Sequence, residues 1–199
     1  MNTKGQVTKE KIIREGAQLI HRNGYNNTGI KEILDAVEIP KGSFYFYFKS
    51  KEDFGIHIIE YYTEFIINGA KVLLGDESQN PLQRLQQYFS TLIKMCEKIN
   101  FQRGCPIGNM ILELSDINDI IRKKLMISYE AIVSVVESNI RQCSEAGYIP
   151  HEEKAENLAT FIFNSWEGAL LNMKLSRSAE PLHIFYDMLF KYIIMEKQI

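Results

Sequence analysis

Apolar residues recur at steps of three and four along nearly the whole chain, which is the spacing of an α-helix. The first such stretch, residues 8–22, is expected to end near Gly24 in a left-handed C-terminal cap. Thr28 is expected to N-cap a second helix, which Pro40 ends, because proline disfavours helical geometry in the residue before it. The pattern predicts a third, very short helix over residues 41–48.

The remaining pattern is also helical. Ser50 and Asp53 have the spacing of a capping box that opens a long helix, and Asn80 followed by Pro81 opens the next. No run alternates as a strand would, so the sequence predicts an all-α fold of about nine helices. The later helices are expected over about 51–74, 81–98, from 106 to about 114, from a cap at Ser115 or Asp116 to 145 or 146, 152–175 and 180–195.

Composition narrows the protein class without identifying it. The 199 residues are 24% charged and 45% hydrophobic, which is ordinary for a globular protein. No segment approaches the roughly 18 uncharged apolar residues of a membrane span, and residues 1–10 are too polar for a secretory signal. The three cysteines are too few and too widely spaced for a disulfide framework or a zinc site. We therefore expect a cytoplasmic protein with reduced thiols, no metal and no membrane association.

The net charge of −2 hides an asymmetry along the chain. Residues 1–51 hold nine Lys or Arg and five acids, a net +4, and the remainder is −6. A basic N-terminal part on an acidic body is typical of a nucleic-acid reader with a separate regulatory part. An excess of this size also arises by chance, so it only adds weight to other signs.

The second and third helices, joined by a tight turn, form a candidate helix-turn-helix. Lys41, Gly42 and Ser43 then lie at the start of the second helix of this unit, where base edges are read. Five aromatic residues follow, and a short helix would turn Phe44 and Phe48 inward and leave the hydroxyls of Tyr45 and Tyr47 outside. The alternative is an aromatic core patch between helices with no binding role.

Three segments resemble the DNA-binding domain of TetR-family transcriptional repressors: TGIKEI at 28–33, IPKGSFYFYF at 39–48 and KSKEDF at 49–54. The resemblance implies a DNA-binding domain over 1–50, a ligand-binding and dimerisation domain over 51–199, and a homodimer on a palindromic DNA operator. Gly29 and Phe46 depart from the family pattern, which removes one hydroxyl and one polar contact. Carried over by position, the DNA contacts are Thr28, Lys31, Lys41, Gly42, Ser43, Tyr45, Tyr47 and Lys51.

The resemblance also places a small-molecule inducer in the C-terminal part and a dimer surface on its last two helices. Large and small apolar residues alternate on the first of these helices, and an apolar stripe follows on the second, at Ile184, Phe185, Met188, Leu189, Tyr192 and Ile193. Both stripes also fit an intrachain core. Candidate pocket residues, most of which equally fit an ordinary core, are Tyr62, Phe65, Tyr88, Phe89, Asn109, Met110 and Trp166.

Cys105 lies at a break between helices and not on a regular apolar face. A helix N-terminus and neighbouring cations lower the pKa of a thiol, and Arg103 is close in sequence. The segments 103–116 and 171–182 resemble a TetR-family branch that includes electrophile-responsive repressors, in which a cysteine and a lysine match Cys105 and Lys174. One hypothesis is that modification of Cys105 releases DNA; the alternative is a structural cysteine beside a reversible pocket for an aromatic or hydrophobic ligand.

Other functions have less support in the sequence. It contains no paired carboxylate and histidine motif, no local Ser-His-Asp context and no glycine-rich phosphate loop, so we expect neither an enzyme nor a bound cofactor. A helical module that only binds other proteins has no need of the lysine-flanked turn at 41–43. The sequence therefore favours a DNA-binding regulator.

Overall fold

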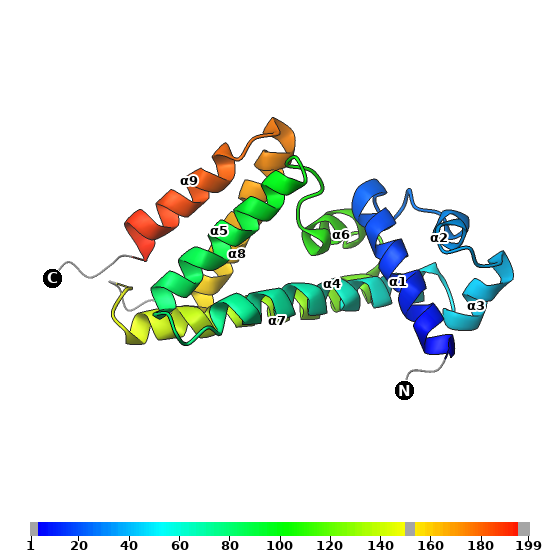
Figure 1. The fold of residues 1–199 in the computed structure, drawn as a ribbon, viewed down its shortest axis with the longest axis horizontal. Coiled ribbons are helices and arrows are strands. Elements are labelled where there is room, and N and C mark those ends of the chain that lie inside the picture. The colour runs from blue at the N-terminus through cyan, green and yellow to red at the C-terminus, as the bar shows by residue number, and fades with distance from the viewer. Residues whose placement is uncertain (1–3, 150–153, 195–199) are drawn as a thin grey trace. The chain divides into compact units, whose positions relative to one another are not determined.

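The computed structural model describes residues 4–149 and 154–194. Within these ranges the chain is helical and contains no strand, so the predicted all-α fold is confirmed (Figure 1). A 3-10 turn, Lys41–Ser43, precedes α3, and a π-helical turn, Leu189–Ile193, follows α9. The nine α-helices of the described residues are α1 Lys4–Asn23, α2 Ile30–Ala36, α3 Phe44–Tyr47, α4 Lys51–Leu74, α5 Pro81–Lys98, α6 Pro106–Leu114, α7 Asp119–Glu145, α8 Ala155–Ser176 and α9 Glu180–Met188.

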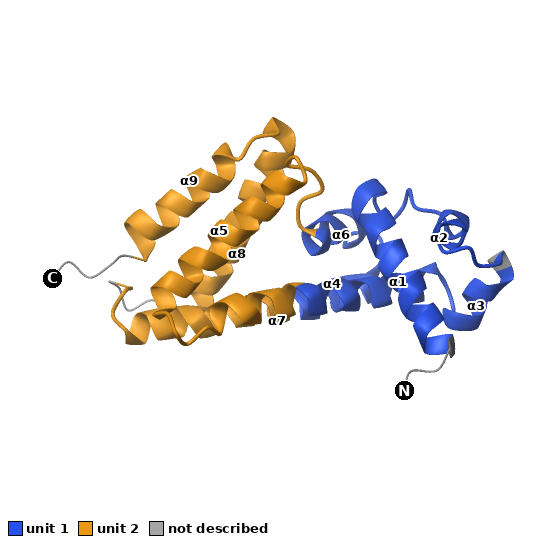
Figure 2. Ribbon diagram, in the orientation of Figure 1, with its two compact units in different colours: residues 1–65, 106–129 blue, residues 66–105, 130–199 orange. Residues whose placement is uncertain are grey.

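The chain forms two compact units, which Figure 2 shows in two colours. The N-terminal unit comprises residues 1–65 and 106–129, and the C-terminal unit comprises residues 66–105 and 130–199. Helices α4 and α7 each contribute residues to both units, and α6 belongs to the first. This division follows packing, whereas a functional boundary between residues 50 and 51 stays a prediction.

An aromatic cluster forms the centre of the N-terminal unit. Phe44, Phe48 and Phe54 are fully buried, with ring centroids 4.9 to 5.6 Å apart. A side chain on Gly16 would meet the ring of Phe54 at 2.4 Å, so the glycine lets α1 approach α4 closely. Phe44 and Phe48 thus face inward from the short helix α3, as the sequence predicts.

The ends of α2 differ from the sequence prediction. Gly29, not Thr28, is its N-cap residue, and the Thr28 hydroxyl donates instead to the carbonyl of Gly24, 2.7 Å away. At the other end the helix stops at Ala36, before Pro40. Glu38 adopts a left-handed φ of 59°, and the amide of Ile39 bonds back to the Leu34 carbonyl, which is a Schellman motif. Local hydrogen bonding therefore ends α2 before the proline does.

Helix starts elsewhere agree with prediction in two places and differ in one. Asn80 and Gln83 form the full capping box that opens α5. At α4 the Ser50 hydroxyl accepts from the amide of Asp53, but the Asp53 carboxylate accepts from the amide of Lys49 and not from that of Ser50. The predicted cap of α7 at Ser115 or Asp116 is wrong. The Asn118 side chain accepts from the amide of Ile121 at 2.9 Å and opens that helix. Residues 115–117 turn before this cap, which the apolar pattern does not reveal.

The C-terminal unit is built on α5, α8 and α9, with α9 packed against both other helices (Figure 1). Its centre is a second aromatic cluster, in which Phe89, Trp166 and Phe185 have ring centroids 5.0 to 5.4 Å apart. The predicted helix over 152–175 begins at Ala155 in the described chain, and residues 152, 153 and 195 lie outside the described residues. None of the described helices is long and apolar enough to cross a membrane.

Truncation of the buried ring at the start of α3 should destabilise the N-terminal unit. Replacing Phe44 by Ala removes a fully buried ring, and we expect a loss of about 3–5 kcal/mol in the free energy of unfolding. Phe46→Ala, two residues away on the exposed side, should change it by less than about 0.5 kcal/mol. Urea unfolding followed by circular dichroism measures both, and equal losses would refute the inward orientation of Phe44.

Candidate functional site

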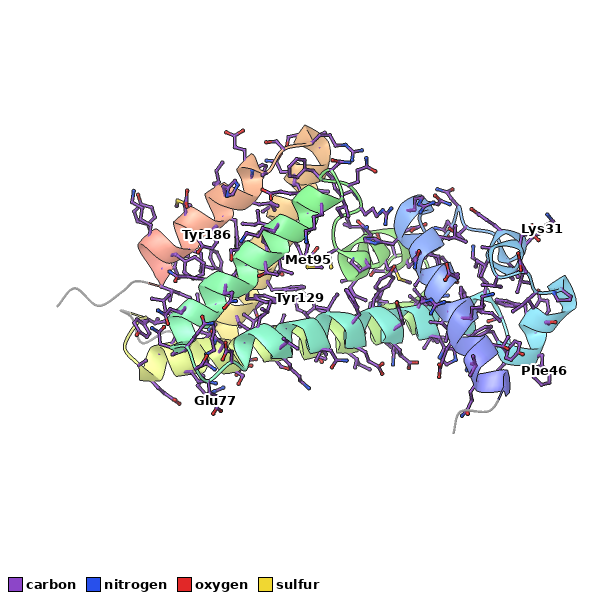
Figure 3. The ribbon with its side chains drawn as sticks, viewed as in Figure 1. Lys31, Phe46, Glu77, Met95, Tyr129 and Tyr186 are labelled. Atoms are coloured by element: carbon purple, nitrogen blue, oxygen red, sulfur yellow. The ribbon has the colours of Figure 1, made fainter. Side chains whose placement is uncertain are left out.

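The short helix α3 and the turn before it present polar and aromatic groups on the outside of the N-terminal unit. Tyr45 is 65% exposed and Phe46 is 81% exposed, whereas Ser43 and Tyr47 are half-buried. Figure 3 shows Phe46 extending outward from this segment. The backbone of Lys41 lies in the 3-10 turn, but its side chain is outside the described residues. Predicted DNA contacts 42, 43, 45 and 47 therefore share one short surface segment.

Two predicted phosphate contacts, Lys31 and Lys51, have different surroundings. Lys31 is exposed on α2 and pairs with Asp35 at 2.8 Å, which raises its pKa (Figure 3). Lys51 lies with Nζ 4.7 Å from the centre of the Tyr25 ring, and burial lowers its pKa although Glu113 opposes this. Thr28 is fully buried, so its side chain shapes the turn, and its contact with DNA stays a prediction.

The turn between α1 and α2 is held by Glu113 of α6, a residue that sequence reasoning missed. Its carboxylate accepts the amide of Tyr25 at 2.8 Å and the amide of Asn26 at 2.6 Å. The Tyr25 hydroxyl donates to the Lys51 carbonyl at 2.8 Å. Burial, followed by the charges of Glu52 and Glu113, raises the pKa of Tyr25 to about 12. The hydroxyl therefore stays protonated and keeps donating at neutral pH.

Lysines of α1 support the helix-turn-helix from the other side. Val37 is the first residue after α2, and Nζ of Lys11 donates to its carbonyl at 3.1 Å. Lys9 lies 5.3 Å from the centre of the Phe48 ring and 3.1 Å from Nε2 of His57. Their Nζ groups are therefore engaged within the unit, so the net charge of residues 1–51 overstates the charge available for a partner.

Cys105 is half-buried, forms no disulfide, and directly precedes α6. Its side chain hydrogen-bonds Glu167 of α8, and Tyr88 of α5 is raised in pKa by burial and by the charges of Cys105 and Glu167. Burial also raises the pKa of Glu167, although the bond to Cys105 opposes it, and Glu167 Oε1 is buried without a hydrogen-bond partner. These three side chains form a polar cluster inside the C-terminal unit.

The backbone before Cys105 is unusual. Asn100, Phe101 and Arg103 all have a φ between 52° and 73°, a region that residues other than glycine rarely adopt. Arg177, at the end of α8, donates to the carbonyl of Phe101 at 3.5 Å. Such backbone conformations cost about 1–3 kcal/mol each and concentrate at functional sites.

The other two cysteines are less reactive: Cys96 is half-buried, and Cys143 is buried. Burial and the nearby charge of Glu97 raise the pKa of Cys96 to about 11, and burial raises that of Cys143 to about 12, although Arg84 opposes this. Both thiols are protonated at neutral pH and are poor nucleophiles.

The remaining predicted pocket residues do not form one described cavity. Phe89 and Trp166 belong to the core of the C-terminal unit. Lys174 lies in the same unit but is half-buried. Tyr62, whose hydroxyl donates to the Ala17 carbonyl at 2.7 Å, lies in the N-terminal unit. The same unit also contains the exposed Phe65, the half-buried Asn109 and the buried Met110. A shared role for these residues in ligand binding stays a prediction.

The predicted dimer surface on α8 and α9 has both buried and exposed apolar residues, and its role in dimerisation stays a prediction. Ile162 and Leu189 are buried within the unit, whereas Phe161 and Ile184 are 54% and 57% exposed. An apolar groove of about 380 Å³ runs between α8 and α9 and includes Ser165, Gly168 and Ala169 on its α8 side. Small residues here leave room for another helix to approach.

Family models match both parts of the chain. Residues 12–55 match the bacterial regulatory proteins of the tetR family, and residues 81–188 match the C-terminal domain of LmrA/YxaF-like transcriptional regulators. The first match contains the whole helix-turn-helix, and the second contains Cys105, Glu167 and α8.

Proteins with similar sequences and structures are regulators too. The transcriptional repressor DhaR of Mycobacterium sp. (strain GP1) is 33% identical over 186 residues, covering 94% of this chain and 92% of the relative. The transcriptional regulator AcuR of Cereibacter sphaeroides is 31% identical over 192 residues, covering 96% and 88%. The crystal structure of Escherichia coli NemR in its reduced form matches with a TM-score of 0.87 at 26% identity, covering 97% of this chain and all of that chain. This chain belongs to the TetR family of bacterial transcriptional regulators.

Proposed function

We propose that this protein is a repressor that binds a palindromic DNA operator as a homodimer and releases it when an effector reaches the C-terminal unit. The observation that carries the proposal is the geometry of α3. The rings of Phe44 and Phe48 are buried, whereas the exposed Phe46 lies beside Gly42, Ser43, Tyr45 and Tyr47. A helix this short reads few base pairs, so two copies related by twofold symmetry supply the length of the operator.

The proposed dimer uses the groove between α8 and α9. Exposed Phe161, Ile184 and Met188 border a surface where small residues permit close packing. Burying such side chains contributes about 25 cal/mol of favourable free energy per Å² of apolar surface. In a twofold dimer the same face of a second copy supplies the matching apolar surface.

The contacts divide into two roles. Lys31 and Lys51 supply positive charge to phosphates, and Tyr45 and Tyr47 offer hydroxyls to phosphate oxygens. Lys41, Gly42 and Ser43 occupy the start of the reading segment, where side chains reach base edges. Phe46, lacking a polar group, contributes apolar contact only.

Removing a phosphate contact should weaken binding to every operator alike. For Lys31→Ala, we expect a similar loss of affinity on matched and altered operators, and a decrease of about one in the slope of log Kd against log salt. Lys94→Ala, which changes an exposed lysine outside the N-terminal unit, is the control and should leave the slope unchanged. Mobility shifts on the DNA upstream of the protein's own coding region measure both.

The outcome also tests the proposed function as a whole. Binding of two chains per operator, counted by sedimentation of the complex, supports the dimer. No sequence-selective binding by the unaltered protein would overturn the proposal, and a change of operator preference in Lys31→Ala would reassign that residue to base reading.

Glu113 is proposed to hold the helix-turn-helix, from α2 to α3, in its DNA-binding arrangement. Its carboxylate satisfies two successive amides in the turn that leads to α2. No other acceptor bonds these two amides in the described structure, so the turn depends on α6 for its conformation. Helix α6 begins directly after Cys105 and carries Glu113 near its end. A shift of α6 caused by an effector at Cys105 would therefore move the carboxylate that holds the turn.

Glutamine at position 113 keeps one acceptor and replaces the other with a donor. We expect Glu113→Gln to lose about 1–3 kcal/mol of stability, because a partly buried amide loses its partner, and to weaken operator binding uniformly. Asp116→Asn, an exposed residue that follows α6, serves as the control. Unchanged affinity and stability in Glu113→Gln would show that the turn holds without this contact.

Two kinds of effector fit the polar cluster at Cys105. In the first, an activated alkene such as a maleimide alkylates Cys105. The thiol proton passes to the Glu167 carboxylate as the sulfur–carbon bond forms, and the electron pair of the alkene C=C bond forms an enolate, which then takes up a proton. The raised pKa of Glu167 favours this transfer, since a carboxylate that resists ionisation is a stronger base. In the second, a reversible ligand donates a hydrogen bond to the unpartnered Glu167 Oε1 and packs against neighbouring aromatic rings. The first mode follows from the resemblance to electrophile-responsive regulators, in which a lysine matches Lys174, and Lys174 is proposed to activate the Cys105 thiol.

The two modes separate on treatment with N-ethylmaleimide. We expect the reagent to abolish operator binding by the unaltered protein and by Cys96→Ser, because the high pKa of Cys96 leaves it unreactive. Cys105→Ser should retain binding after the same treatment. Mass spectrometry locates the adduct and mobility shifts measure the affinity. Alkylation of Cys105 without loss of DNA binding would reject the covalent mode and leave the reversible one.

A further inference from the structure

Arg84 is a buried cation without an anionic partner. It lies in the first turns of α5, is 6% exposed, and makes no ion pair among the described residues. Nη1 donates to the carbonyl of Leu74 at 2.9 Å, and Nη2 donates to Oε1 of Gln142 at 2.6 Å. Its Nε–H is buried without an acceptor. Arginine cannot shed its proton at any ordinary pH, so the charge persists in this environment.

Asn139 of α7 is a second buried donor without an acceptor. It is 1% exposed, and its Oδ1 accepts from the thiol of Cys143 at 3.7 Å, whereas its Nδ2 has no partner. More than about 90% of buried polar groups in proteins are hydrogen-bonded. Two unpartnered donors on side chains that line one cleft therefore point to a ligand that supplies acceptors.

The cleft has a volume of about 380 Å³ and lies within the C-terminal unit. Donors dominate its polar lining, and Glu77 is the only carboxylate among the residues that line it. Glu77 is exposed in the turn after α4, where Figure 3 shows it at the surface. The side chains of the lining that can donate a hydrogen bond are Lys71, Arg84, Ser134, Ser138, Asn139 and Gln142.

Arg84 also has a structural role, because its guanidinium donates to the Leu74 carbonyl and so caps the C-terminal end of α4. That role does not account for the unpartnered Nε–H or for Nδ2 of Asn139. An oxyanion accepts several hydrogen bonds at once and is attracted most strongly where the surroundings exclude water. Hydrogen bonds from Ser78, helped by the positive charge of Arg84, lower the pKa of Asp76. The Asp76 oxygens, however, accept hydrogen bonds from Ser78 and Gln79 and not from Arg84.

We propose that this cleft is a second ligand site of the C-terminal unit, which binds the carboxylate or phosphate group of a small anionic molecule. Arg84 supplies the charge at the base of the cleft, Asn139 supplies a directed donor, and Lys71 with Ser138 closes on the ligand from the exposed rim. The volume suits a small organic acid or phosphate ester. The site is separate from the Cys105 cluster and independent of the reaction proposed there.

The Arg84 Nε–H gives a direct probe of the site. In ¹⁵N–¹H correlation spectra of the full-length protein, its signal is assigned by its loss in Arg84→Lys. Titration with inorganic phosphate and, separately, with acetate, at constant ionic strength against chloride, should move this signal to saturation with at least one of them. Which anion acts at lower concentration identifies the group that the cleft recognises.

A carboxylate placed on the rim should compete with the ligand. Ser138→Glu changes an exposed residue of the cleft, and we expect it to weaken the anion's effect about tenfold, whereas Ser144→Glu, exposed on the same helix outside the cleft, should leave it unchanged. Ser134→Glu, one turn earlier, replaces Ser138→Glu if that variant fails to fold. No saturable shift, an equal shift in chloride, or equal behaviour of the two glutamate variants would overturn the proposal and leave Arg84 as a helix cap alone.

Discussion

The packing of three phenylalanine rings decides what the N-terminal unit can present to a partner. Helix α3 has four residues, and a helix of that length has no stability of its own in water. Its orientation comes from Phe44 and Phe48, which are held against Phe54 of α4. Because the rings of Phe44 and Phe48 are buried in the core of the unit, Tyr45 and Phe46, which lie between them in the sequence, are held on the surface. The polar surface proposed to read DNA is therefore a consequence of an apolar contact.

The turn before α2 shows a similar dependence on a distant residue. Two backbone amides that point away from any helix or sheet need an acceptor, and Glu113 supplies both oxygens. Lysines 9 and 11 of α1 hold the opposite side of the same unit. The helix-turn-helix and the turn before it are thus held by hydrogen bonds from charged side chains of α1 and α6.

The described residues of the C-terminal unit include three buried polar side-chain atoms without a hydrogen-bond partner, on Arg84, Asn139 and Glu167. Leaving such a group unsatisfied costs about 1–3 kcal/mol, which a fold selected only for stability would avoid. Two of these atoms are donors beside a polar cleft, and the third is an acceptor beside Cys105. The chemistry of the unit is consequently complementary: one location lacks acceptors and the other lacks a donor. This division is the physical basis for assigning them different ligands.

The sequence by itself determined the helices and the family, because apolar spacing, the Asn80–Pro81 start of α5 and the aromatic segment 44–48 act locally. It also indicated Cys105, whose place between Gly104 and Pro106 breaks the helical pattern. It could not find the cap at Asn118, the role of Thr28 inside the turn, or the contacts of Glu113 and Glu167. The contacts of Asn118 and Thr28 are local, with Ile121 and Gly24, but neighbouring residues offer the same capping chemistry, so the sequence does not select among them. Glu113 and Glu167 have partners far away in the chain: Glu113 bonds an amide 88 positions earlier, and no local pattern records such a distance. Only the tertiary structure decides which polar groups are removed from water together, and it is that removal which gives them their partners, their shifted pKa values and their chemistry.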